Sequence, residues 1–308
     1  MLDRKGGYLN QEAGDLNQKA GDNSNQFGPI GQVGSININD RRPRPGIPFQ
    51  APLVPSYFVE RPEISQELKQ CLLAEETAKA GTLVVSAIYG LGGIGKSTLA
   101  AALAHDPEVQ KSFPDGVFWA TLGQQPDLLS FLSGWIQTLG DYDFKPTTPE
   151  AASTHLRTLF YDKAALLVVD DVWNPEHVDP FKVGGSGCRV LVTTREARII
   201  DAVPYELNVM TPQQGFQLLT HPWKNKLTDT QTQQAEELAK TVGYLPLALE
   251  LSAAQVRDGV SWEELLTDLQ AEIAHLEALD LIDGDEVSKK KRKHYSLRAS
   301  FNLSLRSA

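Results

Sequence analysis

The sequence predicts an α/β sandwich built on a parallel sheet, followed by a smaller helical domain. Three observations predict it: apolar runs alternate with helix-like segments over residues 57–210, a glycine-rich loop follows the first run, and strand-like runs stop after about residue 211. A continuous apolar run is typical of a strand that is buried on both faces of a parallel sheet. Alternating strands and helices place such a sheet between layers of helix.

A helix is expected before the first strand. Pro62 suits its first turn, where a backbone N–H is not needed. Ile64, Leu68 and Leu72 then repeat at helical spacing. Gly81 would end this helix.

The expected strands are the apolar segments that end in turn or polar residues. They are residues 82–89, 116–122, 164–171 and 189–195, with a weaker candidate at 205–209. Residues 97–105 are expected to form the helix after the first strand. Four further helices are expected within residues 211–222, 231–242, 245–258 and 261–279.

Composition divides the chain into five segments. Residues 1–45 are rich in Gly, Asn and Gln, and they carry too few large apolar groups to offset chain entropy alone. Five prolines in residues 41–55 make 46–56 an extended linker. Residues 57–210 are the expected α/β domain, 211–280 the helical domain, and 281–308 a linker with the start of a further domain.

The composition also narrows the possible partners. A net charge of -10 disfavours non-specific attraction to nucleic acid. No apolar stretch is long enough to cross a membrane, and Cys71 and Cys188 fit neither a disulfide framework nor a zinc site. A soluble protein of a reducing, cytoplasmic compartment is therefore expected, without nucleic acid or membrane as a partner.

Residues 90–100, GLGGIGKSTLA, match the phosphate-binding pattern G-x-x-x-x-G-K-[ST] between an expected strand and an expected helix. Glycines let backbone N–H groups converge on phosphate oxygens, and the helix start adds favourable partial charge. Lys96 would reach the β- and γ-phosphates, and the Ser97 hydroxyl would bind Mg²⁺. The candidate nucleotide contacts are Gly90, Gly92, Gly93, Ile94, Gly95, Lys96, Ser97 and Thr98.

Two later strands end in candidate catalytic groups. Asp170 and Asp171 follow the apolar run LLVV, where Asp170 would hold Mg²⁺ through water and Asp171 would orient or activate an attacking water. Arg195 ends the run RVLVTTR. In isolation, the acidic pair fits a turn and the arginine fits a solvated helix start. Trp119 and Trp173, near strand ends, are expected to pack in the core.

Four motifs in fixed order then carry a resemblance over roughly residues 55–280: GLGGIGKSTLA, LLVVDDVW, CRVLVTTRE and GYLPLALEL. The chain resembles the NB-ARC ATPases of the STAND class of P-loop NTPases, which include plant disease-resistance proteins. The resemblance implies that Arg195 senses the γ-phosphate and that Pro246 closes over the base. It also implies a winged-helix domain, whose start would lie in residues 281–308.

The segment YFVERPE, residues 57–63, is similar to the entry motif of the same family. The resemblance implies that Phe58 and Val59 lie against adenine and that Arg61 fixes the lid or the phosphate region. Glu60 stands where the family usually has glycine, which is a departure from the pattern.

The resemblance implies an ADP/ATP-controlled switch with Mg²⁺ as cofactor, slow ATP hydrolysis and self-association when activated. The alternatives are a conventional P-loop ATPase or kinase and a nucleotide-binding scaffold without hydrolysis. Residues 1–45 contain a tandem imperfect heptad and resemble amyloid-type signalling motifs, so they are a candidate segment for recruiting an effector. A disordered tail or a small ordered cap are the other interpretations of this segment.

Overall fold

The computed structural model describes residues 46–74, 83–196, 199, 201–223, 226–282 and 289–306. The expectations for residues 1–45 and for a helix end at Gly81 lie outside these residues. The first helix, α1, spans Pro62–Leu73 with its proline in the first turn.

The expected parallel sheet is confirmed. It contains β1 (Val84–Tyr89), β2 (Val117–Gly123), β3 (Leu166–Val172), β4 (Arg189–Thr194) and β5 (Ala202–Glu206). The strand order is β2-β3-β4-β1-β5, and every neighbouring pair is parallel. β5 begins three residues before the expected 205–209 segment and contains Pro204, which an edge strand tolerates because one side of it needs no ladder hydrogen bonds.

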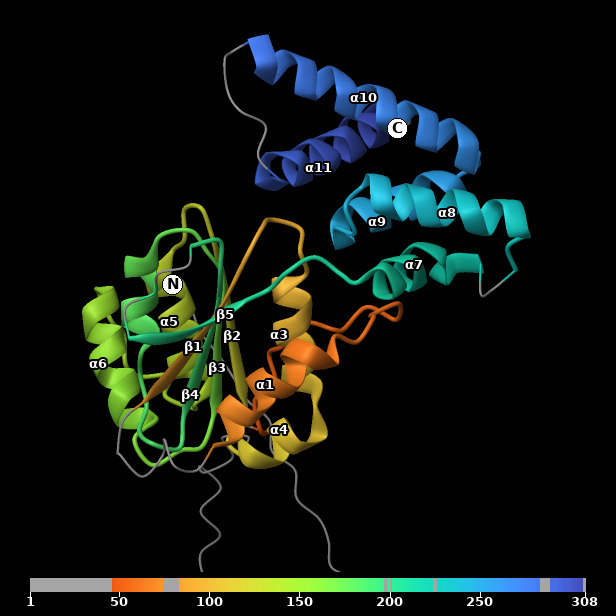
Figure 1. The fold of residues 1–308 in the computed structure, drawn as a ribbon. Helices are drawn as coiled ribbons and strands as arrows, with labels where there is room; N and C mark the ends of the chain where they lie inside the picture. Colours follow the sequence, from red (N-terminus) through yellow and green to blue (C-terminus); the bar gives the residue numbers. More distant parts are fainter. Residues whose placement is uncertain are drawn as a thin grey trace, which may run out of the picture. The chain divides into compact units, whose positions relative to one another are not determined.

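Alternate side chains of the strands point to opposite faces, so each face has its own apolar cluster. On one face, Ile88 and Leu191 pack with α1, α3 (Lys96–His105) and α4 (Pro107–Ser112). On the other face, Phe118 and Val190 pack with α5 (Leu128–Thr138), α6 (Pro149–Leu159) and the short helix η1 (Pro175–Phe181). Figure 1 shows these two helical layers on either side of the sheet. Burial on both faces explains the continuous apolar runs.

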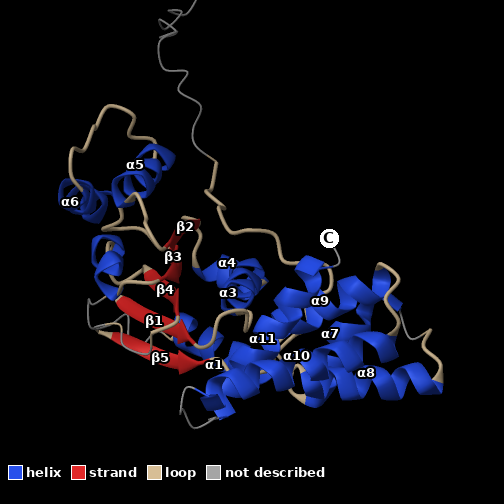
Figure 2. Cartoon of the chain, turned by 90° about the horizontal axis from the view of Figure 1, so that it is seen from above, coloured by secondary structure: helices blue, strands red, loops and turns tan. Residues whose placement is uncertain are grey.

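The part of the chain after the sheet is helical, as expected. It contains α7 (Pro212–Thr220), η2 (His221–Trp223), α8 (Asp229–Thr241), α9 (Pro246–Arg257), α10 (Trp262–Ile282) and α11 (Lys289–Arg306). Thr211 and Thr228 begin α7 and α8 with capping boxes, which fix both helix starts. α11 packs against α9 and α10, and Figure 2 shows these helices gathered together.

The proline-rich segment is extended and pairs with the edge of the sheet. The Gln50 N–H donates to the Val117 carbonyl at 3.0 Å, and the Val117 N–H donates to the Pro48 carbonyl at 2.9 Å. The Trp119 N–H donates to the Gln50 side-chain oxygen at 3.1 Å. The linker therefore covers the edge of β2 at Val117 and Trp119, which would otherwise expose unpaired backbone groups.

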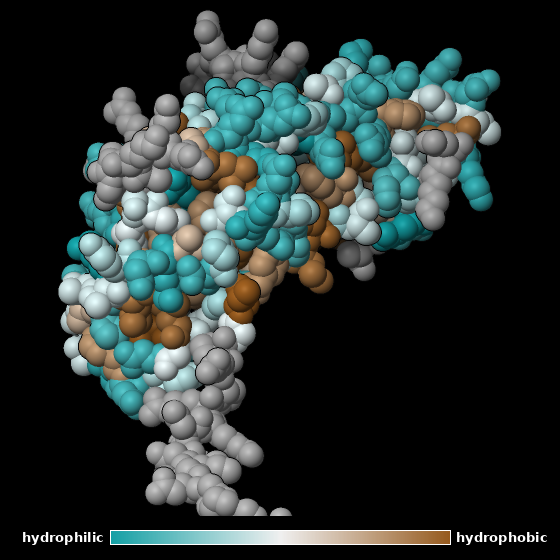
Figure 3. Space-filling view, turned by 90° about the horizontal axis from the view of Figure 1, so that it is seen from below, coloured by the Kyte–Doolittle hydropathy of each residue, from teal (hydrophilic) through white to brown (hydrophobic). Residues whose placement is uncertain are grey.

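On the face that Figure 3 shows, apolar patches lie separately among hydrophilic areas. Ile47 and Leu53 of the linker are among the most exposed large apolar side chains, at 75% and 86%. No helix of the described residues is long and apolar enough to span a membrane.

Candidate functional site

The glycine-rich loop leaves the carboxyl end of β1 and leads directly into α3. A Cβ on Gly90 would lie 2.6 Å from the Leu207 carbonyl oxygen, so only glycine allows this close approach. Gly93 has a φ of +74° and Gly95 a φ of +92°, which are also glycine conformations. The strand-loop-helix context expected for a phosphate-binding loop is therefore present.

Lys96 is buried at the start of α3. Its Nζ donates to the Gly90 carbonyl at 3.1 Å and to the Leu91 carbonyl at 2.9 Å. Burial, and then the neighbouring Arg195 guanidinium, lower the pKa of Lys96 to about 8, against the opposing effects of Asp171 and Asp170. Burial therefore disfavours the charged form of this side chain, and a bound anion would favour it.

The two acidic residues lie in the last part of β3, in agreement with the expected strand 164–171. The β3–β4 register shifts between Val169 and Val172, and Asp171 has a φ of +52°. A bulge of this kind changes the direction of successive side chains. Both carboxylates act to raise the pKa of Lys96, so both lie near its ammonium.

Hydroxyl groups from neighbouring strands hold Asp170. Thr193 Oγ1 donates to Asp170 Oδ1 at 2.5 Å, and Thr121 Oγ1 donates to Oδ2 at 3.3 Å. Thr193 Oγ1 also accepts the Asp171 N–H at 2.9 Å. Neither threonine was predicted from the sequence, although a polar residue at the end of an apolar core strand is a usable signal.

Arg195 lies against the glycine-rich loop and over an aromatic ring. Its Cζ is 4.0 Å from the centre of the Trp173 ring, and a Cβ added to Gly92 would be 3.4 Å from the same atom. The Trp173 Nε1–H donates to Asp171 Oδ2 at 3.2 Å. Trp173 therefore belongs to the site, and the expectation of a core role for it is wrong.

The helical part of the chain completes the pocket. The Leu247 N–H, in the first turn of α9, donates to the Gly93 carbonyl at 3.1 Å. Pro246, Leu247 and Glu250 line a pocket of about 220 Å³. Burial raises the pKa of the Glu250 carboxyl. The other lining residues are Gly92, Gly93, Gly95, Lys96, Ser97, Thr98, Asp171, Thr193 and Arg195.

Arg61 does not line this pocket, but its guanidinium contacts the backbone of the phosphate-binding loop. Its Nη1 donates to the Ile94 carbonyl at 3.1 Å, while Nη2 donates to the Asn208 carbonyl and, at 3.4 Å, to that of Val209. Burial lowers the pKa of the Arg61 guanidinium. The side chain therefore ties the glycine-rich loop to the segment that leads from β5 into α7.

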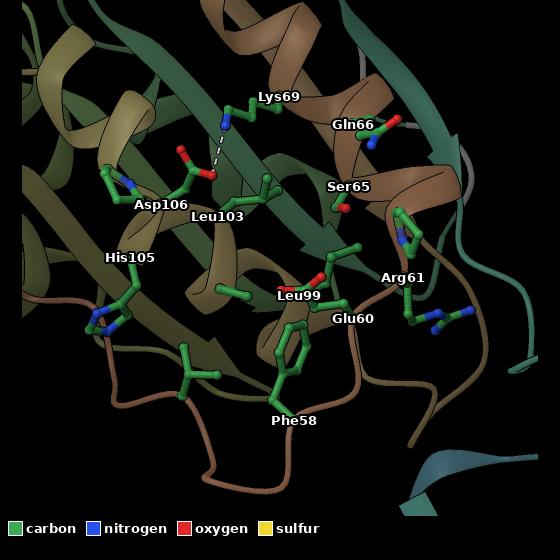
Figure 4. Close-up of a pocket in the computed structure, with 14 residues that line it drawn as sticks. Phe58, Glu60, Arg61, Ser65, Gln66, Lys69, Leu99, Leu103, His105 and Asp106 are labelled. Carbon is green, nitrogen blue, oxygen red and sulfur yellow. Dashed lines mark hydrogen bonds and ion pairs between the residues drawn. The ribbon is translucent and has the colours of Figure 1, made fainter. Parts of the chain in front are cut away.

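Phe58 and Val59 are also outside the pocket of the glycine-rich loop. Val59 is buried in the core. Phe58 lines a separate hollow of about 480 Å³ with Leu99 of α3, and Figure 4 shows the Arg61 side chain pointing away from it. At the opposite end of this hollow, Lys69 Nζ lies 2.8 Å from Asp106 Oδ2. The implied contacts of Phe58 and Val59 with adenine stay predictions.

The residues at the pocket offer few protein oxygens to a metal ion. The described residues contain no group of three or more His, Cys, Asp or Glu side chains that could hold a metal. Asp170 is a buried carboxylate held by hydroxyls, and Ser97 supplies an oxygen on the pocket wall. Mg²⁺ is usually held by one or two protein oxygens together with phosphates and water, and this donor set fits that arrangement.

Comparison with known proteins agrees with this geometry. The family model of the NB-ARC domain matches residues 63–227, which is more than half of the 308-residue chain. The chain belongs to the NB-ARC domain family. As an NB-ARC protein, it has the P-loop NTPase fold expected from the four motifs, with nucleotide binding as the property of the family.

This NB-ARC protein is similar to several regulatory proteins. It is 30% identical over 225 residues to regulatory protein AfsR of Streptomyces coelicolor, which covers 70% of this chain and 22% of the relative. It is 31% identical over 242 residues to human apoptotic protease-activating factor 1, and the alignment covers 73% of this chain and 18% of that relative. The chain thus spans about a fifth of the length of these curated relatives.

The chain also aligns with a solved structure. It is the STAND protein with a tetratricopeptide repeat sensor from Pyrococcus horikoshii, at a TM-score of 0.45 and 18% identity. The alignment covers 82% of this chain and 41% of that chain.

Proposed function

We propose that this chain is the nucleotide-binding part of a STAND-type signalling switch, controlled by exchange of ADP for ATP. The observation that carries the proposal is the pocket shared by the phosphate-binding loop and α9, with the Leu247–Gly93 hydrogen bond across it. A nucleotide in this pocket would touch both the α/β part and the helical part of the chain. Since a ligand shifts an equilibrium only through unequal binding to two states, such a shared pocket is what a switch requires.

The proposed phosphate contacts are the backbone of residues 90–95, Lys96, Ser97 and Thr98. Lys96 would pair with the β- and γ-phosphates, whose negative charge would favour the ammonium form that burial disfavours. Arg195, on the same pocket wall, would contact the γ-phosphate. Pro246 would lie over the base, Phe58 and Val59 would lie against adenine, and Arg61 would fix the lid or the phosphate region, as the family resemblance implies.

Mg²⁺ is the proposed metal cofactor, held by Ser97 and, through water, by Asp170. When bound, it would neutralise charge on the phosphates. Asp171 lines the pocket and would orient or activate the attacking water. We propose that hydrolysis is slow and resets the switch, because phosphoryl transfer depends mainly on positioning and charge stabilisation, which a second state of the protein can complete.

The wider role follows from the same proposal. We propose self-association of the ATP-bound form, recruitment of an effector through residues 1–45, and action in the cytoplasm. Residues 57–210 would then be the nucleotide-binding domain, residues 211–280 its helical lid, and residues 281–308 a linker with the start of a winged-helix domain. The relatives named as a regulatory protein and an apoptotic protease-activating factor support a signalling role.

The nucleotide released by heat from the purified protein tests the proposal. We expect near-stoichiometric ADP from the wild type and none from Lys96→Ala, because this substitution removes the main phosphate cation. A protein that is purified empty, and that turns over ATP well above about one per second as an enzyme of ordinary rate does, would contradict a switch. Self-association that is unchanged in Lys96→Ala would instead favour a scaffold.

A further inference from the structure

The Trp173 ring is held in place from two sides. Its Nε1–H donates to Asp171 Oδ2 at 3.2 Å, and Asp171 is itself fixed by the hydrogen bond from its N–H to Thr193 Oγ1 at 2.9 Å. The indole therefore has a defined position beside the carboxyl ends of β3 and β4. Its face, and not its edge, receives the Arg195 guanidinium, with Cζ 4.0 Å from the ring centre.

The same guanidinium lies against the phosphate-binding loop. A Cβ on Gly92 would be 3.4 Å from Arg195 Cζ and 3.5 Å from each terminal nitrogen. Arg195 is nevertheless an exposed residue on a long, flexible side chain. Such a side chain loses considerable conformational entropy when it is fixed. Stacking on an aromatic ring restricts the side chain before a ligand binds, so that less conformational entropy is lost on binding.

We propose that Trp173 is a positioning residue that holds the Arg195 guanidinium beside the loop, so that the site distinguishes a nucleoside triphosphate from a diphosphate. This inference rests on the proposed function. Arg195 is the second cation of the pocket, after Lys96, and it approaches from the carboxyl end of β4. A fixed Arg195 increases the affinity for a third phosphate and leaves contacts with the first two unchanged.

Trp173→Leu in the full chain tests the inference, with a fluorescent ADP derivative displaced by ADP or by a non-hydrolysable ATP analogue in the presence of Mg²⁺. We expect the preference for the ATP analogue over ADP to fall roughly two- to tenfold, the size of a cation–π contact, while the Kd of ADP is unchanged. Trp173→Phe, which keeps a weaker ring, should fall between the wild type and the leucine variant.

Two controls separate positioning from a structural effect. Trp223→Leu changes another half-buried tryptophan, whose ring centre lies 5.0 Å from that of Trp262, and it should leave the preference unchanged. In an Arg195→Ala background, Trp173→Leu should have no further effect on the preference. The fluorescence emission of Trp173 should also change in the Arg195→Ala variant. It should change when the ATP analogue is added to the wild type, but not when ADP is added.

The possible failures are distinguishable. Equal weakening of both nucleotides, an unchanged preference, or an effect that persists without Arg195 would overturn the role of Trp173 while ADP binding, and so the proposed function, stands. A wild-type protein that binds neither nucleotide would overturn the proposed function and this inference together.

Discussion

The backbone N–H of Leu247 donates a hydrogen bond to the Gly93 carbonyl, 3.1 Å away. This bond joins the first turn of α9 to the phosphate-binding loop. The Leu245 N-cap of α9 has no side-chain capping bond, so the loop carbonyl satisfies one of the otherwise unpaired N–H groups at the helix start. A change in the conformation of the loop on binding phosphate would therefore act directly on α9.

Gly93→Ala should separate α9 from the loop. The added Cβ would lie 2.8 Å from Leu247 Cβ, in a residue with a φ of +74°. We expect overpacking to lower the free energy of unfolding by about 1–3 kcal/mol, in addition to the cost of the strained backbone. We also expect faster amide exchange in α9. Hydrogen exchange and denaturant unfolding of the nucleotide-free protein would measure both effects.

Gly95→Ala is the matched control for this substitution. Gly95 also has a positive φ, of +92°, but a Cβ there would meet no atom within 4 Å. Gly95→Ala should therefore show the backbone strain alone, without faster exchange in α9. Equal exchange in the two variants would mean that the Leu247 contact does not hold the helix.

The affinity for nucleotide should fall as the pH rises above 8. The pKa of Lys96 is about 8 without nucleotide, and pairing with phosphate raises it, so binding takes up a proton at any pH between the two values. The Kd of ADP should then increase up to about tenfold per pH unit above pH 8 and level off below it. Titration calorimetry from pH 7.5 to 9.5 measures this, in a range where the phosphates stay ionised. A Kd that is constant over this range would show that Lys96 stays charged without nucleotide.

Thr193→Val should loosen the carboxylate that is proposed to hold Mg²⁺. The substitution keeps the side-chain shape but removes the hydroxyl between Asp170 Oδ1 and the Asp171 N–H, so one buried donor and one acceptor lose a partner. We expect a destabilisation of about 1–3 kcal/mol and a smaller gain in ATP affinity on adding Mg²⁺. Thr193→Ser, which keeps the hydroxyl, should restore the Mg²⁺ effect. If the serine variant behaves like valine, the methyl packing of Thr193 is what matters.

The sequence predicted those features of the site that depend on neighbours along the chain. The loop with Lys96 and the residue Arg195 each follow an apolar strand, the acidic pair lies at the end of another, and parallel strands bring such ends to one edge. The prediction did not include the insertion of β4 between β1 and β3, because strand order depends on crossovers between distant segments. The bulge at Asp171 and the stacking of Trp173 on Arg195 were missed for the same reason.

Arg61 illustrates this limit and carries a further prediction. Its guanidinium bonds the Ile94 carbonyl, 33 positions away, and the Asn208 carbonyl, 147 positions away, a pairing that no local pattern encodes. Arg61→Met keeps the aliphatic part of the side chain but leaves these carbonyls without their donor. We expect a loss of about 2–4 kcal/mol in the free energy of unfolding, with increased amide exchange in residues 207–211.

Two further variants define what Arg61 contributes. Arg61→Lys should not restore stability, because an ammonium cannot reproduce the planar fork that reaches both the loop and the segment before α7. Glu63→Gln removes the partly exposed carboxylate 4.0 Å from Arg61 Nε and should change stability by less than about 1 kcal/mol. If Glu63→Gln is as destabilising as Arg61→Met, the ion pair stabilises this junction. If only Arg61→Met is destabilising, the backbone carbonyls are the partners that count, and the junction between the sheet and α7 depends on the position of the phosphate-binding loop.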